Sequence, residues 1–568
     1  MSHRHAAPRR RAASRPRAWI AALVGVVVVV AGGYWWFGRD EAGTEPASPS
    51  NELRTTAWTR APAADVKNGG RLRLAVSVWP ANLNPVQADG EGASTTQVLS
   101  PTTGGAVRLT SDGGWRVYPN YARAVDVVDE KPLTVRVRLN RDAVWQDGTP
   151  ITAEDMTAFR RAMSGEVGGL EVASTDGFDD IASVKRGDDR FEYTVRFSTP
   201  RADWPRYVYP RLPSDVSTKR KVFNRGFRTK AVPSNGPFVV ASINRKTGTI
   251  TEKRNPRWWG RTARLEQVVW RIADPSVQAR AFAAEELDAV SVDGATYDEV
   301  ADAGDVQRAA GGQWSHLTLN GGRGPLKDVD VRRAVAAAID RDALADAAGQ
   351  DVDAPGQTAG SLLLVPGQRG YRDVAARELP SGDDKARALL EKAGYRQVDG
   401  KATRRGNPLT LTLPMPSDTP TSKTRVEAVA ADLEDVGITV KTPTVKASRF
   451  FRDRVVPLDF DLITFTWPAS AFPVEVAEPR FRPVDSPQNF TGVTTKLRGR
   501  WTAAIGALDA DRRTDLIHDL DARLLRQAVV IPLSVVPDVV VVRSGLVNFG
   551  AATFEQPDYT IVGYRTAK

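Results

Sequence analysis

Alternating apolar and polar residues predict several half-buried β-strands. In NGGRLRLAVSV, Leu72, Leu74 and Val76 share one face of a strand, and arginines occupy much of the other. The same period of two recurs in LTVRVRLN (residues 133–140) and in FEYTVRF (residues 191–197). Strands of this kind bury one face only, so the sequence predicts sheets with one face toward a core.

Helical periodicity appears further along the chain and alternates with strands. VRRAVAAAIDRDAL (331–344) repeats apolar residues every four positions, as one helix would, and VEAVAADLEDVG (426–437) ends at a glycine. The strands ITVK (438–441) and DFDLITFTW (459–467) follow. This order predicts a mixed α/β protein, and its length of 568 residues predicts more than one domain.

The stretch WQDGTPITAEDM (145–156) gathers three carboxylates and has two explanations, an acid site or a helix start. Thr152 stands where an N-cap belongs, and Asp155 follows it at capping-box spacing. Ile151 and Met156 have the spacing of a hydrophobic staple, and Glu154 falls in the first turn, where the helix dipole favours a carboxylate. We therefore predict a helix start.

The N-terminal region predicts a membrane anchor. Residues 18–38 form a stretch without a charged residue, and the length of this stretch is about that needed to cross a bilayer as a helix. Arginines precede this segment and acids follow it, so we expect a basic cytoplasmic tail (1–17), a transmembrane helix (18–38) and a flexible linker (39–68), with the large remainder outside the cell. A cleaved secretory signal is the competing interpretation.

Charge and composition exclude several functions. Six arginines lie within residues 1–17, ahead of the first acid, Asp40, and without these six the formal net charge of +10 falls to +4, so no nucleic-acid partner is expected. The chain has no cysteine, which excludes disulfides, thiolate metal sites and a lipid-modified cysteine.

Catalytic motifs are missing from the sequence as well. His3 and His5 lie in the N-terminal tail, and neither His316 nor His518 belongs to a G-x-S-x-G or H-E-x-x-H pattern. No P-loop occurs, and we expect neither an enzyme nor a cofactor or metal. A hydrolase that depends on His316 is the weakest alternative.

Several blocks, in order, resemble the extracellular solute-binding proteins of family 5, the peptide, nickel and oligosaccharide receptors of ABC importers. They are GGRLRLAVSVWPANLNP, WQDGTPITAEDM, SNGPFVV, TEKRNPRWWG and LTLNGGRGPLKDVDVRRAVAAAIDRDAL, and IPL precedes the final strands. The resemblance implies a two-lobed α/β fold, periplasmic-binding-protein-like, with a ligand between the lobes and a separate permease and ATPase as partners. It also implies boundaries: lobe I from 69–110, 226–315 and 530–568, an extra subdomain from 111–225, and lobe II from 316–529.

One departure from the family pattern bears on the ligand. Peptide receptors of this family tend to carry an aspartate for the peptide amine after the strand that DFDLITFTW matches, but here Ser470 stands near that position and Glu475 lies further along. A buried ammonium without a carboxylate is costly, so a neutral, polyhydroxylated or lipid-linked ligand is favoured over a free-amine peptide. The residues expected to face the ligand are Trp79, Asn84, Ser234, Asn235, Asn320, Trp467, Ser470 and Phe472.

These observations predict a membrane-anchored, monomeric binding protein that delivers a small-molecule, oligosaccharide, lipid-linked or peptide ligand to an ABC permease. Two alternatives stay open at this point. The aromatic residues near Trp467 could be core packing, and the FPV stretch (472–474) is similar to an actinobacterial subgroup that includes a regulator of lipoglycan synthesis. In the latter case the chain would be a regulatory or scaffold protein of envelope synthesis that no longer transports.

Overall fold

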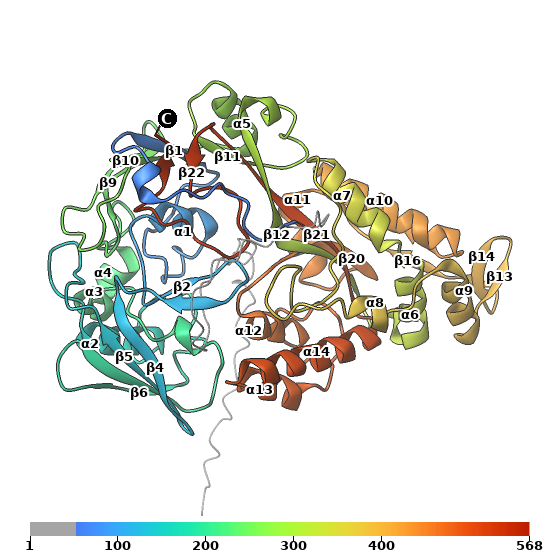
Figure 1. Cartoon of the computed structure of the whole chain (residues 1–568). Coiled ribbons are helices and arrows are strands. Elements are labelled where there is room, and N and C mark those ends of the chain that lie inside the picture. The colour runs from blue at the N-terminus through green and yellow to red at the C-terminus, as the bar shows by residue number, and fades with distance from the viewer. Residues whose placement is uncertain (1–52, 418, 567–568) are drawn as a thin grey trace, which may run out of the picture.

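The first predicted strand forms the edge of a four-stranded sheet in the computed structural model, which describes residues 53–417 and 419–566 (Figure 1). Strand β1 (Arg71–Val76) buries Leu72, Leu74 and Val76, as its alternation predicts. It pairs in parallel with β10, and the sheet has the order β1-β10-β9-β8. The other members are β8 (Phe238–Asn244), β9 (Thr249–Arg254) and β10 (Gln267–Ile272).

A second sheet is antiparallel and has the order β4-β5-β7-β6. Its strands β5 and β7 are the other two strands that the alternation of apolar and polar residues predicts. Its inward residues pack beneath helix α2, which lies against β6 and α3. We call these two sheets, with their helices, the first lobe. Its further elements are β4 (Ala122–Glu130), β5 (Leu133–Leu139), β6 (Ile181–Arg186), β7 (Glu192–Phe197), α1 (Ala93–Leu99), β2 (Val107–Leu109), β3 (Trp115–Val117), α2 (Ala153–Met163), α3 (Ser214–Thr218), α4 (Arg220–Arg225), α5 (Pro275–Ala283), β22 (Leu546–Val547) and β23 (Gly563–Tyr564).

The predicted helix start at Thr152 is confirmed. The Thr152 amide donates a hydrogen bond of 2.8 Å to the Asp155 carboxylate, and α2 begins at the next residue. Asp155 also accepts a 2.8 Å bond from the Ser214 amide of α3, so one buried carboxylate caps α2 and holds α3. Met156 is buried, as the staple requires.

The second lobe consists mainly of helices (Figure 1). The single helix expected over 331–344 is wrong: α6 ends at Ala338 and α7 begins at Arg341. Asp340 takes an extended backbone and accepts bonds from two amides of α7, so its N-cap role ends the helical run. The elements of this lobe are α6 (Val329–Ala338), α7 (Arg341–Gln350), α8 (Ala375–Glu378), α9 (Asp383–Lys392), β13 (Arg396–Val398), β14 (Lys401–Arg404), β15 (Asn407–Pro408), β16 (Thr410–Thr412), β17 (Met415–Pro416), α10 (Pro420–Asp435), β18 (Thr439–Lys441), β19 (Thr444–Val445), α11 (Ala447–Phe450), α12 (Pro473–Ala477), α13 (Arg498–Ile505) and α14 (Ala510–Gln527).

Two long strands connect the lobes. Strands β12 (Asp305–Leu319) and β21 (Val530–Val542) pair with each other along nearly their whole length. At one end β21 also pairs with β11 (Ala289–Val292), and at the other end β12 pairs with β20 (Leu462–Pro468). Figure 1 shows both strands passing from the first lobe to the second. The same backbone ladder therefore belongs to both lobes.

Of the segments predicted for residues 1–68, the structure describes only residues 53–68. The predicted membrane span at 18–38 lies outside the described residues, and the described helices include none long and apolar enough to cross a membrane. Residues 53–68, assigned from sequence to the flexible linker, instead pack on the folded body. Trp58 and Val66 are buried there, and Ala57 donates a backbone bond to Ala551 near the C-terminus.

Replacing Asp155 by alanine should lower the free energy of unfolding by about 1–3 kcal/mol, because two part-buried amides, of Thr152 and Ser214, lose their acceptor. Chemical denaturation of the full chain measures this. Glu154→Ala is the matched control, since Glu154 is exposed in the same turn. Equal losses in the two variants would contradict the capping role of Asp155.

Candidate ligand-binding site

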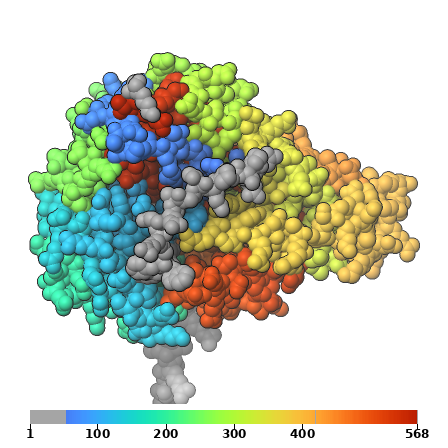
Figure 2. Space-filling model, in the orientation of Figure 1, coloured from blue at the N-terminus to red at the C-terminus, as the bar shows by residue number. Residues whose placement is uncertain are grey.

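A small cavity of about 80 Å³ lies where the first lobe meets the second. In Figure 2 the cyan surface of the first lobe borders the orange-red surface of the helices near residue 510. The first lobe contributes Asp112, Gly113, Gly114, Ala202 and Asp203, and the second contributes Leu364, Gln368, Arg369, Ala471, Phe472, Pro473, Val474, Glu475, Ala510, Arg513, Thr514 and Ile517. A larger hollow, of about 540 Å³, is lined only by second-lobe residues between Pro325 and Thr410, away from this junction.

Polar contacts join the lobes at the rim of the cavity. Arg369 forms an ion pair of 2.8 Å with Asp112, and its amide donates to the Asp112 carbonyl. The neighbouring Gln368 donates a 2.8 Å bond to the carbonyl of Ser470. Residues 368–369 therefore contact both the first lobe and the loop predicted to face the ligand.

A buried charge cluster forms the first-lobe wall. Asp203 is fully buried and accepts a 2.7 Å bond from Arg201 and a 2.9 Å bond from the Tyr207 hydroxyl. The Arg206 guanidinium lies 3.6 Å from the same carboxylate and 5.2 Å from the ring of Phe472, which belongs to the second lobe. The charge on Asp203 is thus compensated by two arginines at the junction.

Glu475 is the acidic group on the second-lobe wall. Its Oε1 is buried and finds no hydrogen-bond partner among the described residues. Burial, followed by the nearby Asp203 carboxylate, raises the pKa of Glu475 to about 8. At neutral pH this carboxyl is therefore mostly protonated, and it can donate a hydrogen bond where an ionised carboxylate could not.

Trp467 is the centre of an aromatic cluster in the second lobe. Only 6% of its surface is exposed, and its ring stacks on His316 with centroids 3.8 Å apart. Trp314 meets it edge-on at 5.3 Å from the paired strand, and the Arg480 guanidinium lies 4.4 Å from its centroid. The core-packing interpretation of Trp467 therefore has clear structural support.

Ser470 and Phe472 lie in the loop that follows β20. The Ser470 hydroxyl accepts a 2.9 Å bond from the Phe472 amide, which shapes the loop before α12. Phe472 lines the cavity and is otherwise buried. Of the eight residues predicted to face a ligand, Trp467, Ser470 and Phe472 are brought together near the junction of the lobes.

Four other predicted site residues are buried and hold loops. Asn84 donates to the carbonyl of Phe223, and Asn320 donates to two second-lobe carbonyls, those of Leu458 and Phe460. Ser234 donates to main-chain carbonyls, and Asn235 bonds both to the amide and to the carbonyl of Gly104. Their side chains are already engaged in this structure, so a ligand contact for them stays a prediction.

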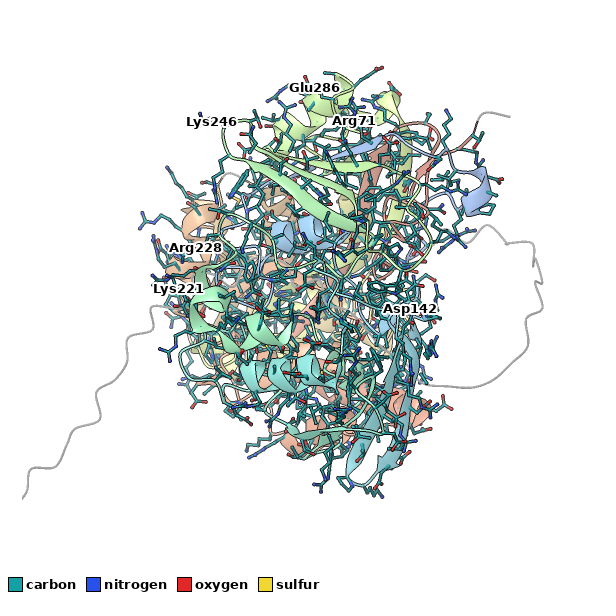
Figure 3. The ribbon with its side chains drawn as sticks, turned by 90° about the vertical axis from the view of Figure 1, so that its left-hand side faces the viewer. Arg71, Asp142, Lys221, Arg228, Lys246 and Glu286 are labelled. Carbon is teal, nitrogen blue, oxygen red and sulfur yellow. The ribbon has the colours of Figure 1, made fainter. Side chains whose placement is uncertain are left out.

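Trp79 lies apart from the cavity. The Arg245 guanidinium sits 4.6 Å from its ring and donates to the carbonyl of Arg228. Figure 3 shows Arg228 and Lys246, the neighbour of Arg245 in the chain, at the outer surface of the molecule. Trp79 is not among the residues that line the cavity, so its contact with a ligand stays a prediction.

The histidines take structural positions. His316 is fully buried, and its Nδ1 lies 3.0 Å from the Thr318 hydroxyl. His518 donates from Nε2 to the carbonyl of Gly370 at 2.8 Å. Within residues 53–417 and 419–566 there is no group of three or more His, Asp or Glu side chains placed to hold a metal ion.

Sequence reasoning missed most of the cavity wall. Asp203, Gln368, Arg369 and Arg513 come from segments that lie far apart in the chain, and no local motif marks them. The spacing of Glu475 from β20 did not identify it as a site residue. Its place as the third residue of helix α12, which begins at Pro473, is the available signal.

Comparison with known proteins agrees with this architecture. Residues 116–481 match the model of the bacterial extracellular solute-binding proteins, family 5 middle. The oligopeptide-binding protein OppA of Mycobacterium tuberculosis is 30% identical over 518 residues, covering 88% of this chain and 86% of that protein. A probable monoacyl phosphatidylinositol tetramannoside-binding protein, LpqW, of the same organism is 26% identical, covering 57% of this chain and 55% of that one.

Solved structures share the fold at lower identity. The periplasmic EDTA-binding protein EppA has a TM-score of 0.80 and 24% identity, covering 91% of this chain and all of that one. The oligopeptide-binding protein AppA of Bacillus subtilis, in complex with a nonapeptide, has a TM-score of 0.66 and 16% identity, covering 89% of this chain and all of that one. The two-lobed α/β fold expected from the sequence is thus confirmed.

Replacing Trp467 by alanine should lower the free energy of unfolding by about 3–5 kcal/mol, because a buried ring would leave a cavity. Thermal and chemical denaturation of the full chain measures the loss. Trp467→Phe keeps part of the stacking on His316 and should lose less. Unchanged stability in the alanine variant would show that the ring does not support the fold.

Glu475→Gln should alter the pH dependence of stability. Its raised pKa, about 8, means that the folded chain keeps a proton that the unfolded chain releases near its ordinary value of 4.5. The wild type therefore loses stability from this group as the pH rises from 5 to 9, and the variant does not. The melting temperature of the variant relative to wild type should rise over that window.

The exposed Glu154→Gln variant, measured in parallel, controls for general effects of removing a carboxylate. A difference between Glu475→Gln and wild type that stays constant from pH 5 to 9 would contradict the raised pKa of Glu475.

Proposed function

Because the chain belongs to the bacterial extracellular solute-binding proteins of family 5, which are binding proteins and not enzymes, we propose that it captures a solute between its lobes for an ABC importer. In this proposal the loaded protein delivers the solute to separate permease and ATPase subunits. The protein itself needs no cofactor and acts as a monomer.

The observation that carries the proposal is the cavity at the junction of the lobes. Its walls come from both lobes, and the Arg369–Asp112 ion pair joins them at the rim. A ligand held there contacts both lobes at once, so its binding favours the closed arrangement. The continuous β12–β21 ladder supports this, because a pivot within it would change the cavity without separating the lobes.

The groups at the junction favour a ligand that does not depend on a free amine. Ser470 stands where peptide receptors of the family tend to place an aspartate, and its hydroxyl is engaged with the Phe472 amide. Glu475, the carboxyl that the second lobe contributes to the cavity wall, is mostly protonated at neutral pH because its pKa is about 8. Neither supplies the full negative charge that an ammonium group requires when buried. We assign the ligand-facing role to Trp467, at the end of β20, and to Ser470 and Phe472 in the loop that follows.

The chain is placed at the membrane in this proposal. Residues 18–38 form a single span, with residues 1–17 in the cytoplasm and the lobes outside. The body divides into lobe I (69–110, 226–315 and 530–568), an extra subdomain (111–225) and lobe II (316–529), and the first lobe described above comprises most of lobe I together with this subdomain. The four-stranded sheet of β4 to β7 lies within the range given to the subdomain.

Native mass spectrometry of the full chain, purified from its own host without denaturation, tests the proposal. We expect a co-purifying small molecule that leaves when the protein unfolds. An empty protein whose melting temperature no metabolite pool raises would argue against solute capture. A bound peptide that loses affinity on N-acetylation would instead overturn the ligand class, while solute capture itself would stand.

A further inference from the structure

We propose that Arg480, on the ring of Trp467, forms a subsite for a carboxylate group of the ligand. This inference rests on the proposed function, because it names a chemical group of the captured solute. Arg480 belongs to the short 3₁₀ turn Glu478–Phe481, which follows α12. Its guanidinium lies 4.4 Å from the Trp467 centroid, near the end of β20.

The clearest indication is a comparison among the buried arginines. Three arginines of the described chain are buried, and each keeps only 8% of its surface exposed: Arg201, Arg332 and Arg480. Arg201 pairs with Asp203, and Arg332 donates to main-chain carbonyls, among them that of Leu326. The side chain of Arg480 makes neither an ion pair nor a hydrogen bond with any residue that the structure describes, and its guanidinium instead lies over the Trp467 ring. Its N–H donors alone are left without a protein acceptor.

An unpartnered buried guanidinium is costly, because it has lost water without gaining a counter-charge. Burial alone lowers the pKa of Arg480 to about 9, and no acidic side chain opposes that effect. The group nevertheless keeps its charge at neutral pH. The N–H groups of the Arg480 guanidinium are therefore available as hydrogen-bond donors to the anionic group of a bound ligand.

His316, which also contacts the Trp467 ring, has a second polar group without a hydrogen-bond partner in the described chain. It stacks on Trp467, and its Nε2 is buried without a partner among the described residues. Burial and the positive charges of Arg480 and Arg425 lower its pKa well below the usual value, so the imidazole is neutral. When the Thr318 hydroxyl donates to Nδ1, the ring proton sits on Nε2 and is a free donor.

The geometry favours a carboxylate over other anions. A guanidinium presents a planar fork that matches the two oxygens of a carboxylate, and one guanidinium beside a neutral imidazole balances one negative charge. Phe465 and Phe481 flank Trp467 with centroids 6.0 and 6.4 Å from its own, so the wall next to the charge is apolar. An organic acid with a flat or apolar body fits such a wall.

The Trp467 ring under Arg480 is close in the chain to a residue that lines the cavity at the junction of the lobes. Trp467 is the penultimate residue of β20, and Ser470 and Phe472 follow within five positions. Phe472 reaches the cavity wall and lies near Arg206 of the first lobe. A ligand could therefore place its acid group at Arg480 and extend its remainder toward the cavity.

Benzoate, with benzamide as its neutral isostere, tests the subsite on the full chain. We expect benzoate to raise the melting temperature saturably and benzamide to have at least tenfold weaker binding. Arg480→Met should abolish the benzoate response, and its empty form should melt no lower than wild type, because the variant removes an uncompensated buried charge. Arg123→Met, at an exposed arginine of β4, is the matched control and should respond as wild type does.

Three results would overturn the assignment. An Arg480→Met variant that melts lower yet still responds to benzoate would make Arg480 a packing residue. Equal binding of benzoate and benzamide would remove the charge requirement, and a response to inorganic phosphate alone would assign the site to phosphoryl groups. Solute capture is measured separately by the co-purifying mass, so either proposal can fail while the other stands.

Discussion

The pairing of β12 with β21 is the constraint on which the two-lobed arrangement depends. Residues 305–309 pair with 538–542 in the first lobe, and residues 313–318 pair with 530–536 in the second. Between them the register shifts, and Gly311 lies so close to the partner strand that a Cβ there would be 1.4 Å from the Val536 carbonyl oxygen. Only glycine permits this approach, so one residue type preserves a ladder that both lobes share.

Several polar groups near the junction lack a partner in the described chain. Elsewhere many buried polar side chains are engaged: Asp155 caps α2 and holds α3, and Asn84 and Asn235 hold loops. Near the junction the Glu475 Oε1 and the His316 Nε2 are buried without a hydrogen-bond partner among the described residues. Such groups are expensive in a core, and a ligand that pairs with them would recover that cost.

The electrostatics of the junction follow from the same incompleteness. Asp203 forms ion pairs with Arg201 and Arg206, whereas burial raises the pKa of Glu475 to about 8. Arg480 keeps its charge with no compensation at all. These charges are the basis on which we propose an anionic or neutral ligand.

Local sequence determined what depends on neighbours in the chain. The alternation at β1, β5 and β7, the capping box at Thr152 and the end of α10 before Gly437 were all predicted, because a strand face or a helix cap is set within a few residues. The exception is the break between α6 and α7, where the N-cap bonds of Asp340 outweigh apolar periodicity. Only the tertiary structure decided the site, because Asp203, Arg369, Glu475 and Arg480 come from segments that no spacing rule connects. Their burial and their partners exist only once the lobes have met, and a missing partner leaves no trace in the sequence.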